Sequence, residues 1–398
     1  MGQESRFSNK GKVRASKLSL SDVASQGLGF SPLGRNGLAL HRSGFFHPLT
    51  NQSSIFDVGE AEKLQSKKKD SQKPLEFTEA QLGGFTNNFE GRNLIRPTQF
   101  GKVYRGKIEP GMIGKEAQDV TVKIWDEKAY RLAYPDDYIV LDEEVKFLTD
   151  PSVNHHPNLV KLIGYCRGVD VKGVVYDLNL RDSLHNLIRK ESFNWFQRIK
   201  VAVRFARLLE FLHGQAKPYL VLGIDAGHIM LDQDWNPILF EFGLMSGGIL
   251  GELSFVKKEI PGSIGYVDPY LATTGLRWNA CCDVFSFGII VLGLISKRIV
   301  NMEEMAKRIA DKEEVESLMI LLVNEWAKRE YKPKCSLVHS SLEEDCNYHV
   351  GDGPIITALG MRCVERHPNN RPTMKEVVAC LEGLLVVQHQ HHGDEVGM

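Results

Sequence analysis

Residues 217–232 read KPYLVLGIDAGHIMLD, and residues 240–244 read FEFGL. Apolar residues at Val221 and at 229–231 frame a loop that contains Gly223, Asp225 and His228. Apolar side chains on both sides of a short polar loop indicate that a core holds the loop in place. The stretch therefore predicts a buried framework, and the rest of the chain must show what the loop inside it can do.

Length and composition describe a globular protein. The chain has 398 residues, of which 42% are hydrophobic, enough for one large domain or two of ordinary size. The formal net charge of -1 gives no overall attraction to nucleic acid, so no nucleic-acid partner is expected. The seven cysteines have neither metal-ligand spacing nor a secreted disulfide pattern, which favours a cytoplasmic location.

The two ends of the chain differ in composition from its middle. Residues 1–75 are rich in Ser, Gly, Asn and Lys without periodicity, which predicts a disordered extension. Lys and Arg outnumber Asp and Glu in residues 1–50, so this extension is expected to favour peripheral contact with the inner face of the plasma membrane. Residues 386–398 predict a flexible, His-rich tail.

The middle of the chain changes from strand-like to helical patterns. Short apolar runs predict a small β-rich lobe at about 92–178, with one helix between its strands. Apolar residues at helical spacing predict a larger helical lobe at about 180–385. Within it, the apolar run Val284–Ser296 is too short to cross a bilayer and predicts a buried helix. The expected fold class is α+β with two lobes.

Eight short stretches follow one another in a fixed order. They are FTEAQLGGFTNNF (77–89), FGKVYRG (100–106), VTVK (120–123), HPNLVKLIGYC (156–166), VVYDLN (174–179), GYVDP (265–269), DVFSFG (283–288) and RPTMKEVV (371–378). Together they resemble a protein kinase domain over residues 76–385, specifically the plant receptor-like cytoplasmic kinases of the Pelle and interleukin-receptor-associated kinase group. This resemblance implies a bilobal fold, in which ATP and Mg²⁺ are expected as cofactors only if residual binding persists.

The resemblance implies a nucleotide site, parts of which persist. Lys123 takes the place of the lysine that holds the phosphates and pairs with a helix glutamate. Glu144 rather than Glu143 is the expected partner, because it shares a helical face with Leu141 and Leu148. The residues expected around a bound nucleotide are Val103, Thr121, Lys123, Glu144, Tyr176, Asp177, Asn179 and Met230.

The resemblance also implies a column of apolar side chains that joins the lobes. Leu148, Val221 and Phe242 are expected in this column, with Val103 and Met230 on the two sides of an adenine ring. Core packing without any ligand explains each of these apolar positions equally well.

The phosphate-binding loop departs from the glycine-rich pattern of kinases. The sequence RPTQFG at 96–101 keeps Gly101, whereas Arg96 and Thr98 replace the other two glycines. Side chains at these positions are expected to hinder close approach of phosphates, although Arg96 could meet a phosphate with its charge. Thr121 replaces the small alanine above the adenine and is expected to crowd the pocket.

The catalytic positions depart further. Aligning HIMLD with the family's NILLD puts Gly223 at the proton-accepting aspartate and Leu222 at the preceding arginine. By the same alignment, Asp225 replaces a lysine, His228 replaces the magnesium-binding asparagine and Glu241 replaces the aspartate of the metal-binding turn. No catalytic residue is retained, Glu241 is the one metal-ligand candidate, and the site is more negative, which opposes phosphoryl transfer.

Two other interpretations remain. Asp225, His228 and Glu241 could assemble a different metal site or acid–base pair. Alternatively, Lys123, Glu144 and Glu241 could support a weak or atypical ATP-dependent Ser/Thr kinase.

The end of the activation segment also departs from the family. Tyr270 replaces the glutamate that pairs with Arg371, so Asp268 or another acid is expected to replace it. The sequence as a whole predicts a catalytically impaired kinase-like protein, a pseudokinase. The resemblance implies that it acts as an adaptor or scaffold for other proteins, in particular active receptor or cytoplasmic kinases and immune receptors.

Overall fold

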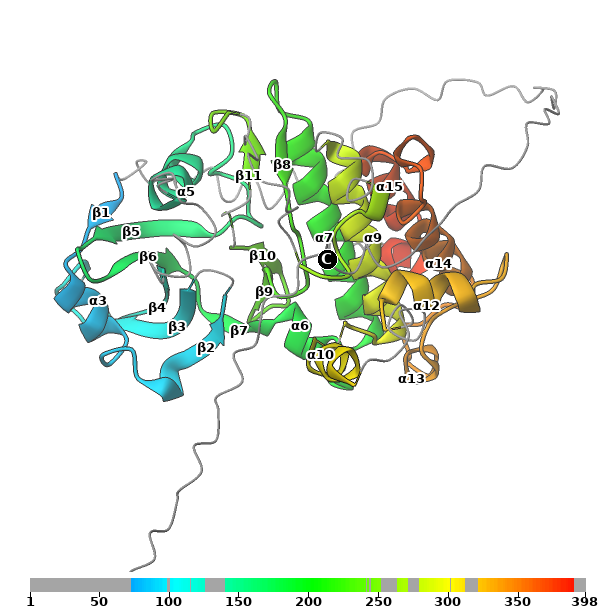
Figure 1. Ribbon diagram of the computed structural model, residues 1–398, viewed down its shortest axis with the longest axis horizontal. Helices are drawn as coiled ribbons and strands as arrows, with labels where there is room; N and C mark the ends of the chain where they lie inside the picture. Colours follow the sequence, from blue (N-terminus) through cyan, green and yellow to red (C-terminus); the bar gives the residue numbers. More distant parts are fainter. Residues whose placement is uncertain are drawn as a thin grey trace, which may run out of the picture.

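The computed structural model describes residues 73–98, 101–114, 116–125, 140–240, 242, 245–251, 263–270, 279–300, 302–311 and 321–389. Figure 1 shows a sheet-containing small lobe beside a mainly helical large lobe. The predicted two-lobed α+β fold is therefore confirmed.

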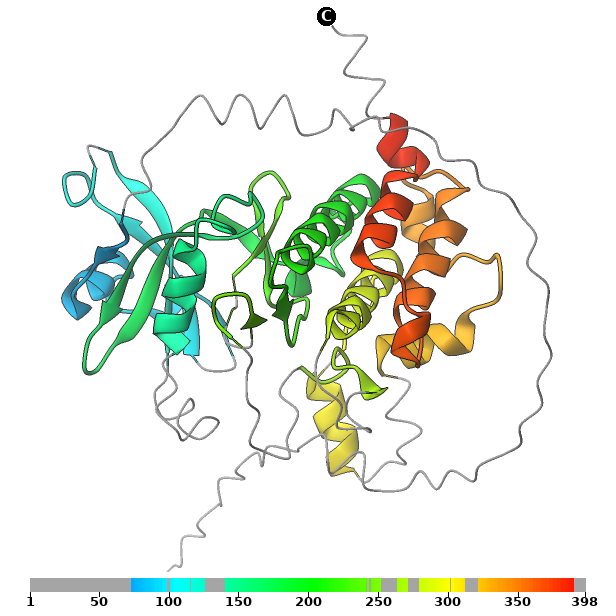
Figure 2. The same ribbon diagram turned by 90° about the horizontal axis from the view of Figure 1, so that it is seen from above.

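The small lobe is built on one six-stranded sheet with the strand order β1-β5-β6-β4-β3-β2. All neighbouring strands pair antiparallel except β1 and β5, which are parallel. Helix α5 (Val140–Thr149) lies beside this sheet, as both views show (Figures 1 and 2). The strands are β1 (Leu75–Glu76), β2 (Leu94–Pro97), β3 (Gly101–Ile108), β4 (Gln118–Trp125), β5 (Lys161–Arg167) and β6 (Lys172–Asp177).

The small lobe begins before residue 92, the predicted start. Leu75 pairs with Gly164 of β5, although the sequence placed Leu75 in the extension. Helix α3 (Glu79–Phe85) begins with a capping box at Thr78 and buries Leu82 against the sheet. These apolar contacts make residues 75–91 part of the lobe, and the 3-10 turn η1 (Gly91–Asn93) leads from them into β2. Residues 1–72 of the predicted extension lie outside the described residues.

The large lobe packs its helices around α9. The predicted buried helix is present, beginning at Ala280, and nearly all its residues are buried. Among the described residues, no helix combines the length and apolar character that crossing a bilayer requires. The helices are α6 (Leu184–Leu187), α7 (Trp195–His213), α9 (Ala280–Ser296), α10 (Met302–Ala310), α12 (Val323–Glu330), α13 (Ser340–Glu343), α14 (Asp352–Cys363) and α15 (Met374–Glu382), with the 3-10 turn η2 (Pro368–Asn370).

Short strands of the large lobe hold the loops that face the small lobe. Strand β9 pairs with both β7 and β10, and β8 pairs with β11. The loop at 222–228 lies between β8 and β9, so both of its ends are fixed by strand pairing. These strands are β7 (Leu180–Ser183), β8 (Tyr219–Val221), β9 (Ile229–Asp232), β10 (Pro237–Leu239) and β11 (Met245–Gly247).

Arg371 has the acidic partner that the sequence could not identify. Its guanidinium group donates to both carboxylate oxygens of Asp268, at 2.5 and 2.9 Å, and both side chains are buried. Further bonds to the carbonyl oxygens of Cys281, Glu365 and Arg366 use the remaining donors. Asp268 therefore replaces the missing glutamate at the base of the large lobe.

The end of the domain extends beyond the predicted start of the flexible tail. Val386 is buried, and its amide donates to the Asp352 carboxylate at 3.0 Å. Residues 385–389 are helical, so residues 386–389 belong to the folded domain and not to the predicted flexible tail. Residues 390–398 lie outside the described residues.

Candidate functional site

The structure brings Lys123 and Glu144 together. The Lys123 Nζ atom lies 2.7 Å from Glu144 Oε2, and both side chains are almost fully buried. The Tyr176 hydroxyl donates to the other carboxylate oxygen, Oε1. Because β4, α5 and β6 each supply one of these groups, the pair ties the helix to the sheet. Both residues belong to the expected nucleotide site, and the structure brings them into direct contact.

A tyrosine outside the predicted site holds the far end of α5. The Tyr219 hydroxyl donates to Asp150 Oδ2 at 2.8 Å and accepts from the Ile249 amide at 3.1 Å. Its ring packs edge-on against Phe147 of α5, with 5.1 Å between centroids. Burial raises the pKa of Tyr219 to about 12, so the hydroxyl keeps its proton. Tyr219 thus links α5 to β8 and to the segment after β11 through contacts between protein groups alone.

The expected column of apolar side chains is assembled. Leu148, Val221 and Phe242 are all buried in one apolar cluster. The Phe242 ring lies 5.2 Å from that of Phe147 on α5. The Val221 amide donates to Asp283 of α9, at 2.8 Å, which fixes the strand before the catalytic loop. The apolar framework expected around the site is therefore assembled.

The two side chains expected on either side of an adenine ring are both buried. Val103 and Met230, expected on the two sides of the ring, are both 0% exposed. The Thr121 hydroxyl donates to the Leu178 carbonyl of the segment that links the lobes, at 2.9 Å. The Leu178 carbonyl, at the edge of the expected nucleotide site, is therefore already an acceptor for Thr121.

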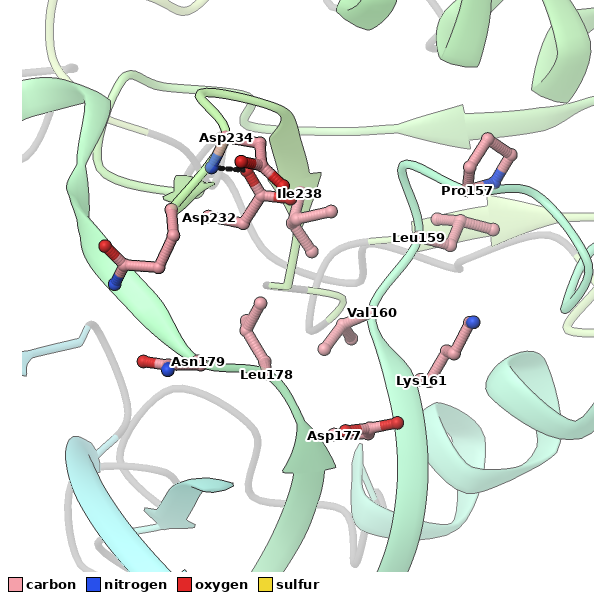
Figure 3. A pocket seen from close by; sticks show the side chains of 11 residues that line it. Pro157, Leu159, Val160, Lys161, Asp177, Leu178, Asn179, Asp232, Asp234 and Ile238 are labelled. Atoms are coloured by element: carbon pink, nitrogen blue, oxygen red, sulfur yellow. Dashed lines mark hydrogen bonds between the residues drawn. The ribbon is translucent and has the colours of Figure 1, made fainter. Parts of the chain in front are cut away.

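Asp177 and Asn179 lie on the outer side of the same linking segment. Asp177 accepts from the Gln118 side chain at 2.8 Å, and Asn179 donates to Asp119 at 3.3 Å. Both side chains line a separate pocket of about 300 Å³, shown in Figure 3. The structure thus does not bring their side chains to Lys123. This pocket is lined by Pro157, Leu159, Val160, Lys161, Asp177, Leu178, Asn179, Asp232, Gln233, Asp234 and Ile238.

The retained glycine of the phosphate loop serves the sheet. A Cβ atom on Gly101 would lie 1.9 Å from the Ile124 carbonyl oxygen, so only glycine fits where β3 meets β4. The Gly101 carbonyl accepts from the Thr98 amide at 2.8 Å, which closes the turn. Sheet packing alone therefore explains why Gly101 persists.

Arg96 takes a position that the sequence did not predict. Its guanidinium group crosses from β2 to the catalytic loop and lies against Gly227. A Cβ atom on Gly227 would be only 2.0 Å from Arg96 Nη1. The sequence contained a signal for this contact, since an arginine stood at a glycine position, but the target of a long side chain cannot be read from spacing.

The catalytic loop is closed by its own hydrogen bonds. Asp225 Oδ1 accepts from the amides of Gly227 and His228, at 2.6 and 2.9 Å, and the Ser263 hydroxyl donates to Oδ2. His228 Nδ1 lies 2.9 Å from the Gly223 carbonyl oxygen, so Nδ1 carries the proton in this bond. His228 Nε2 faces Asp225 Oδ2 at 3.6 Å. The replaced residues thus form a network of their own.

The Asp225 carboxylate is stabilised in its charged form. Burial opposes its ionisation, but His228, the Ser263 hydrogen bond and Arg96 outweigh this and lower the pKa of Asp225. A carboxylate that accepts several hydrogen bonds and has a lowered pKa is a weak proton acceptor. Asp225 is therefore poorly suited to replace the missing base at Gly223.

Leu222 and Gly223 are the remaining predicted positions that the structure describes, and neither side chain has an ionisable group. Leu222 is 3% exposed, so an apolar side chain fills the core where an arginine was expected. Gly223 has a φ of 83°, in the left-handed region that favours glycine. Glu241 lies outside the described residues, as does its part in the alternative metal site. Within the described part of the chain, no three His, Cys, Asp or Glu side chains form a group that could hold a metal ion.

Comparison with known proteins identifies the family. Residues 91–321 match the protein tyrosine and serine/threonine kinase family. The chain is similar to the probable serine/threonine-protein kinase PBL12 of Arabidopsis thaliana, with 33% identity over 81% of this chain and 72% of the relative. It is also similar to the Arabidopsis serine/threonine-protein kinase BIK1, with 31% identity over 84% of this chain and 82% of the relative.

A third relative comes from another plant. This EPD1-interacting receptor-like cytoplasmic serine/threonine-protein kinase of Nicotiana benthamiana is 33% identical over 77% of this chain and 63% of the relative. The chain therefore belongs to the protein kinase family and is related to the receptor-like cytoplasmic serine/threonine kinases of plants.

Proposed function

We propose that this chain is a pseudokinase, a kinase-fold protein that binds other proteins and does not transfer phosphate. The observation that carries this proposal is the catalytic loop, where Gly223 supplies no proton acceptor and the nearby Asp225 is held in hydrogen bonds. Removal of a general base alone costs about 10²- to 10⁴-fold in rate.

The other departures support the same conclusion. His228 presents a ring nitrogen that is bonded to the Gly223 carbonyl, whereas Mg²⁺ prefers oxygen ligands. Asp225 puts a negative charge where the family has a lysine, and phosphoryl transfer depends on positive charge around the phosphoryl oxygens. These groups act as a unit in active kinases, so their costs do not simply multiply, but none compensates for another.

A second candidate function is a weak or atypical ATP-dependent Ser/Thr kinase. The buried Lys123–Glu144 pair favours it, because the same pair is required in active protein kinases. The relatives favour it as well, since their names describe serine/threonine-protein kinases. In this case ATP and Mg²⁺ would be the cofactors, with Glu241 as the metal ligand.

The proposed partners are other proteins, in particular active receptor or cytoplasmic kinases and immune receptors. The name of the Nicotiana relative describes an interaction with another protein, EPD1, which supports a role in recognition. We place the chain in the cytoplasm, with peripheral contact to the plasma membrane through its basic residues 1–50.

Transfer of labelled phosphate from ATP tests the proposal. The full chain and a Lys123→Met variant are incubated with Mg²⁺ or Mn²⁺, a general Ser/Thr substrate protein and labelled ATP. The pseudokinase proposal expects equal background incorporation in both. Incorporation that depends on Lys123 would instead establish the second candidate.

A further inference from the structure

Arg96 spans the cleft between the lobes. Its backbone belongs to β2 of the small lobe, whereas its guanidinium group lies on Gly227 of the large lobe. A Cβ atom on Gly227 would be 2.0 Å from Nη1 and 2.7 Å from Cζ. The absence of a side chain at Gly227 is therefore what leaves room for the guanidinium group.

Charge favours the same position. Burial of Asp225 opposes its ionisation and is the largest influence on its pKa. His228, Ser263 and then Arg96 act in the opposite direction and lower the pKa of Asp225. In the alignment with kinases, Arg96 stands at a glycine position and Asp225 at a lysine position. Their opposite charges attract each other between the two lobes. The opposite charges of these two departures favour their contact but supply no catalytic group.

The Arg96 guanidinium group uses only part of its hydrogen-bonding capacity within the described part of the chain. Its Nε donates to the Pro97 carbonyl at 3.1 Å. Its Nη1 atom is buried and has no hydrogen-bond partner within the described part of the chain. The guanidinium group is thus held by charge and packing more than by saturated hydrogen bonds, so a change on either side of the cleft should release it.

We propose that Arg96 is the residue that excludes nucleotide from this kinase fold, by occupying the space between β2 and the loop at 222–228. This inference rests on the proposed loss of phosphate transfer and explains its first step. A nucleotide would have to break the Arg96 contacts and separate the buried Val103 and Met230 side chains before its phosphates could enter.

The opposite role makes the opposite prediction. An arginine in a phosphate loop can bind a phosphate directly, and its removal would then weaken nucleotide binding. If Arg96 instead excludes nucleotide, its removal strengthens binding. The sign of a single affinity change therefore separates the two roles.

The experiment measures equilibrium binding of a fluorescent ATP analogue, with Mg²⁺, to the full chain. The Arg96→Ala variant is expected to bind at least about tenfold more tightly than the unmodified chain, which corresponds to about 1.4 kcal/mol. Arg92→Ala is the matched control, because Arg92 lies in the same segment, is exposed and pairs only with Glu90 among the described residues. The control is expected to change affinity less than about twofold.

A second variant tests the contact from the other lobe. Gly227→Ala keeps every charge and a permitted backbone, since the φ of Gly227 is outside the left-handed region, but its Cβ atom displaces the guanidinium group. It is expected to bind the analogue at least about threefold more tightly, or about 0.65 kcal/mol. If Arg96→Ala does not fold, Gly227→Ala decides the outcome.

Unchanged or weaker binding in the variants, including no measurable binding in any protein, would overturn the inference. The proposed function is judged separately. A variant that gains nucleotide but transfers no phosphate supports both proposals, whereas one that gains nucleotide and transfers phosphate supports the role of Arg96 and contradicts irreversible loss of the catalytic groups.

Discussion

The Lys123 ammonium group lies 2.7 Å from Glu144 in a buried ion pair, whereas the residue that aligns with the catalytic base of kinases is Gly223. Active protein kinases require both the pair and the base. Here the pair has a structural reason to persist, because it joins β4 to α5 in the core of the small lobe. The ion pair is therefore accounted for by the fold alone.

Loss of Lys123 is expected to destabilise the fold. The Lys123→Met variant leaves a buried carboxylate at Glu144 without its ion pair, which costs about 3–5 kcal/mol of the free energy of unfolding. The double variant Lys123→Met, Glu144→Leu should lose less than the sum of the two single changes. Urea unfolding followed by circular dichroism measures all of these values, and additive losses would show that the pair is not coupled.

The Asp268–Arg371 pair is expected to be a major structural contact. Asp268→Ala leaves a buried guanidinium group without its carboxylate, so the free energy of unfolding should fall by about 3–5 kcal/mol. Asp142→Asn is the matched control, since it breaks the exposed ion pair with Arg167 and should cost less than about 1 kcal/mol. Equal effects of the two changes in urea unfolding would contradict this assignment.

Asp225 is expected to make stability depend on pH. Its pKa is lowered in the folded state, so its contribution is present above its unfolded pKa of about 3.9 and is lost as the pH falls through the folded pKa. At pH 7, Asp225→Asn should lower the free energy of unfolding by about 1.5–3 kcal/mol. This difference from the unmodified chain should shrink below about pH 4. A difference that stays constant from pH 7 to about pH 3 would contradict the assignment.

The Tyr219 hydroxyl is expected to protect the segment after β11. Tyr219→Phe removes the acceptor of the Ile249 amide and the donor to Asp150, at a cost of about 0.5–1.5 kcal/mol. Amide hydrogen exchange at Ile249 should become faster. Tyr331→Phe, at a hydroxyl for which the described residues include no hydrogen-bond partner, is the control. Unchanged exchange at Ile249 would mean that the hydroxyl does not hold this segment.

Local patterns predicted the framework of the fold. Helical spacing placed Glu144 on the face of α5 that turns inward, and the structure buries it against Lys123. Thr373 and Glu376 have the spacing of a capping box, and the structure has one at the start of α15. Such features depend on residues that are near in sequence, so their periodicity is visible in one chain.

Contacts between distant segments could not be predicted in the same way. Arg96 and Gly227 are in contact because the two lobes pack together. The spacing of residues within either segment does not indicate this contact. Likewise, Leu75 joined the sheet through pairing with Gly164, although its local composition indicated a disordered extension. In both cases tertiary contacts, rather than local preference, determine where the residue lies.

The initial rate of phosphate transfer from labelled ATP tests the central claim most directly. The full chain is compared with its folded Lys123→Met variant, and an active receptor-like cytoplasmic kinase serves as the positive control under the same conditions. The account predicts that the full chain and the variant give the same background rate with either Mg²⁺ or Mn²⁺. A rate in the full chain that clearly exceeds that of the variant would contradict it and identify the chain as an active kinase.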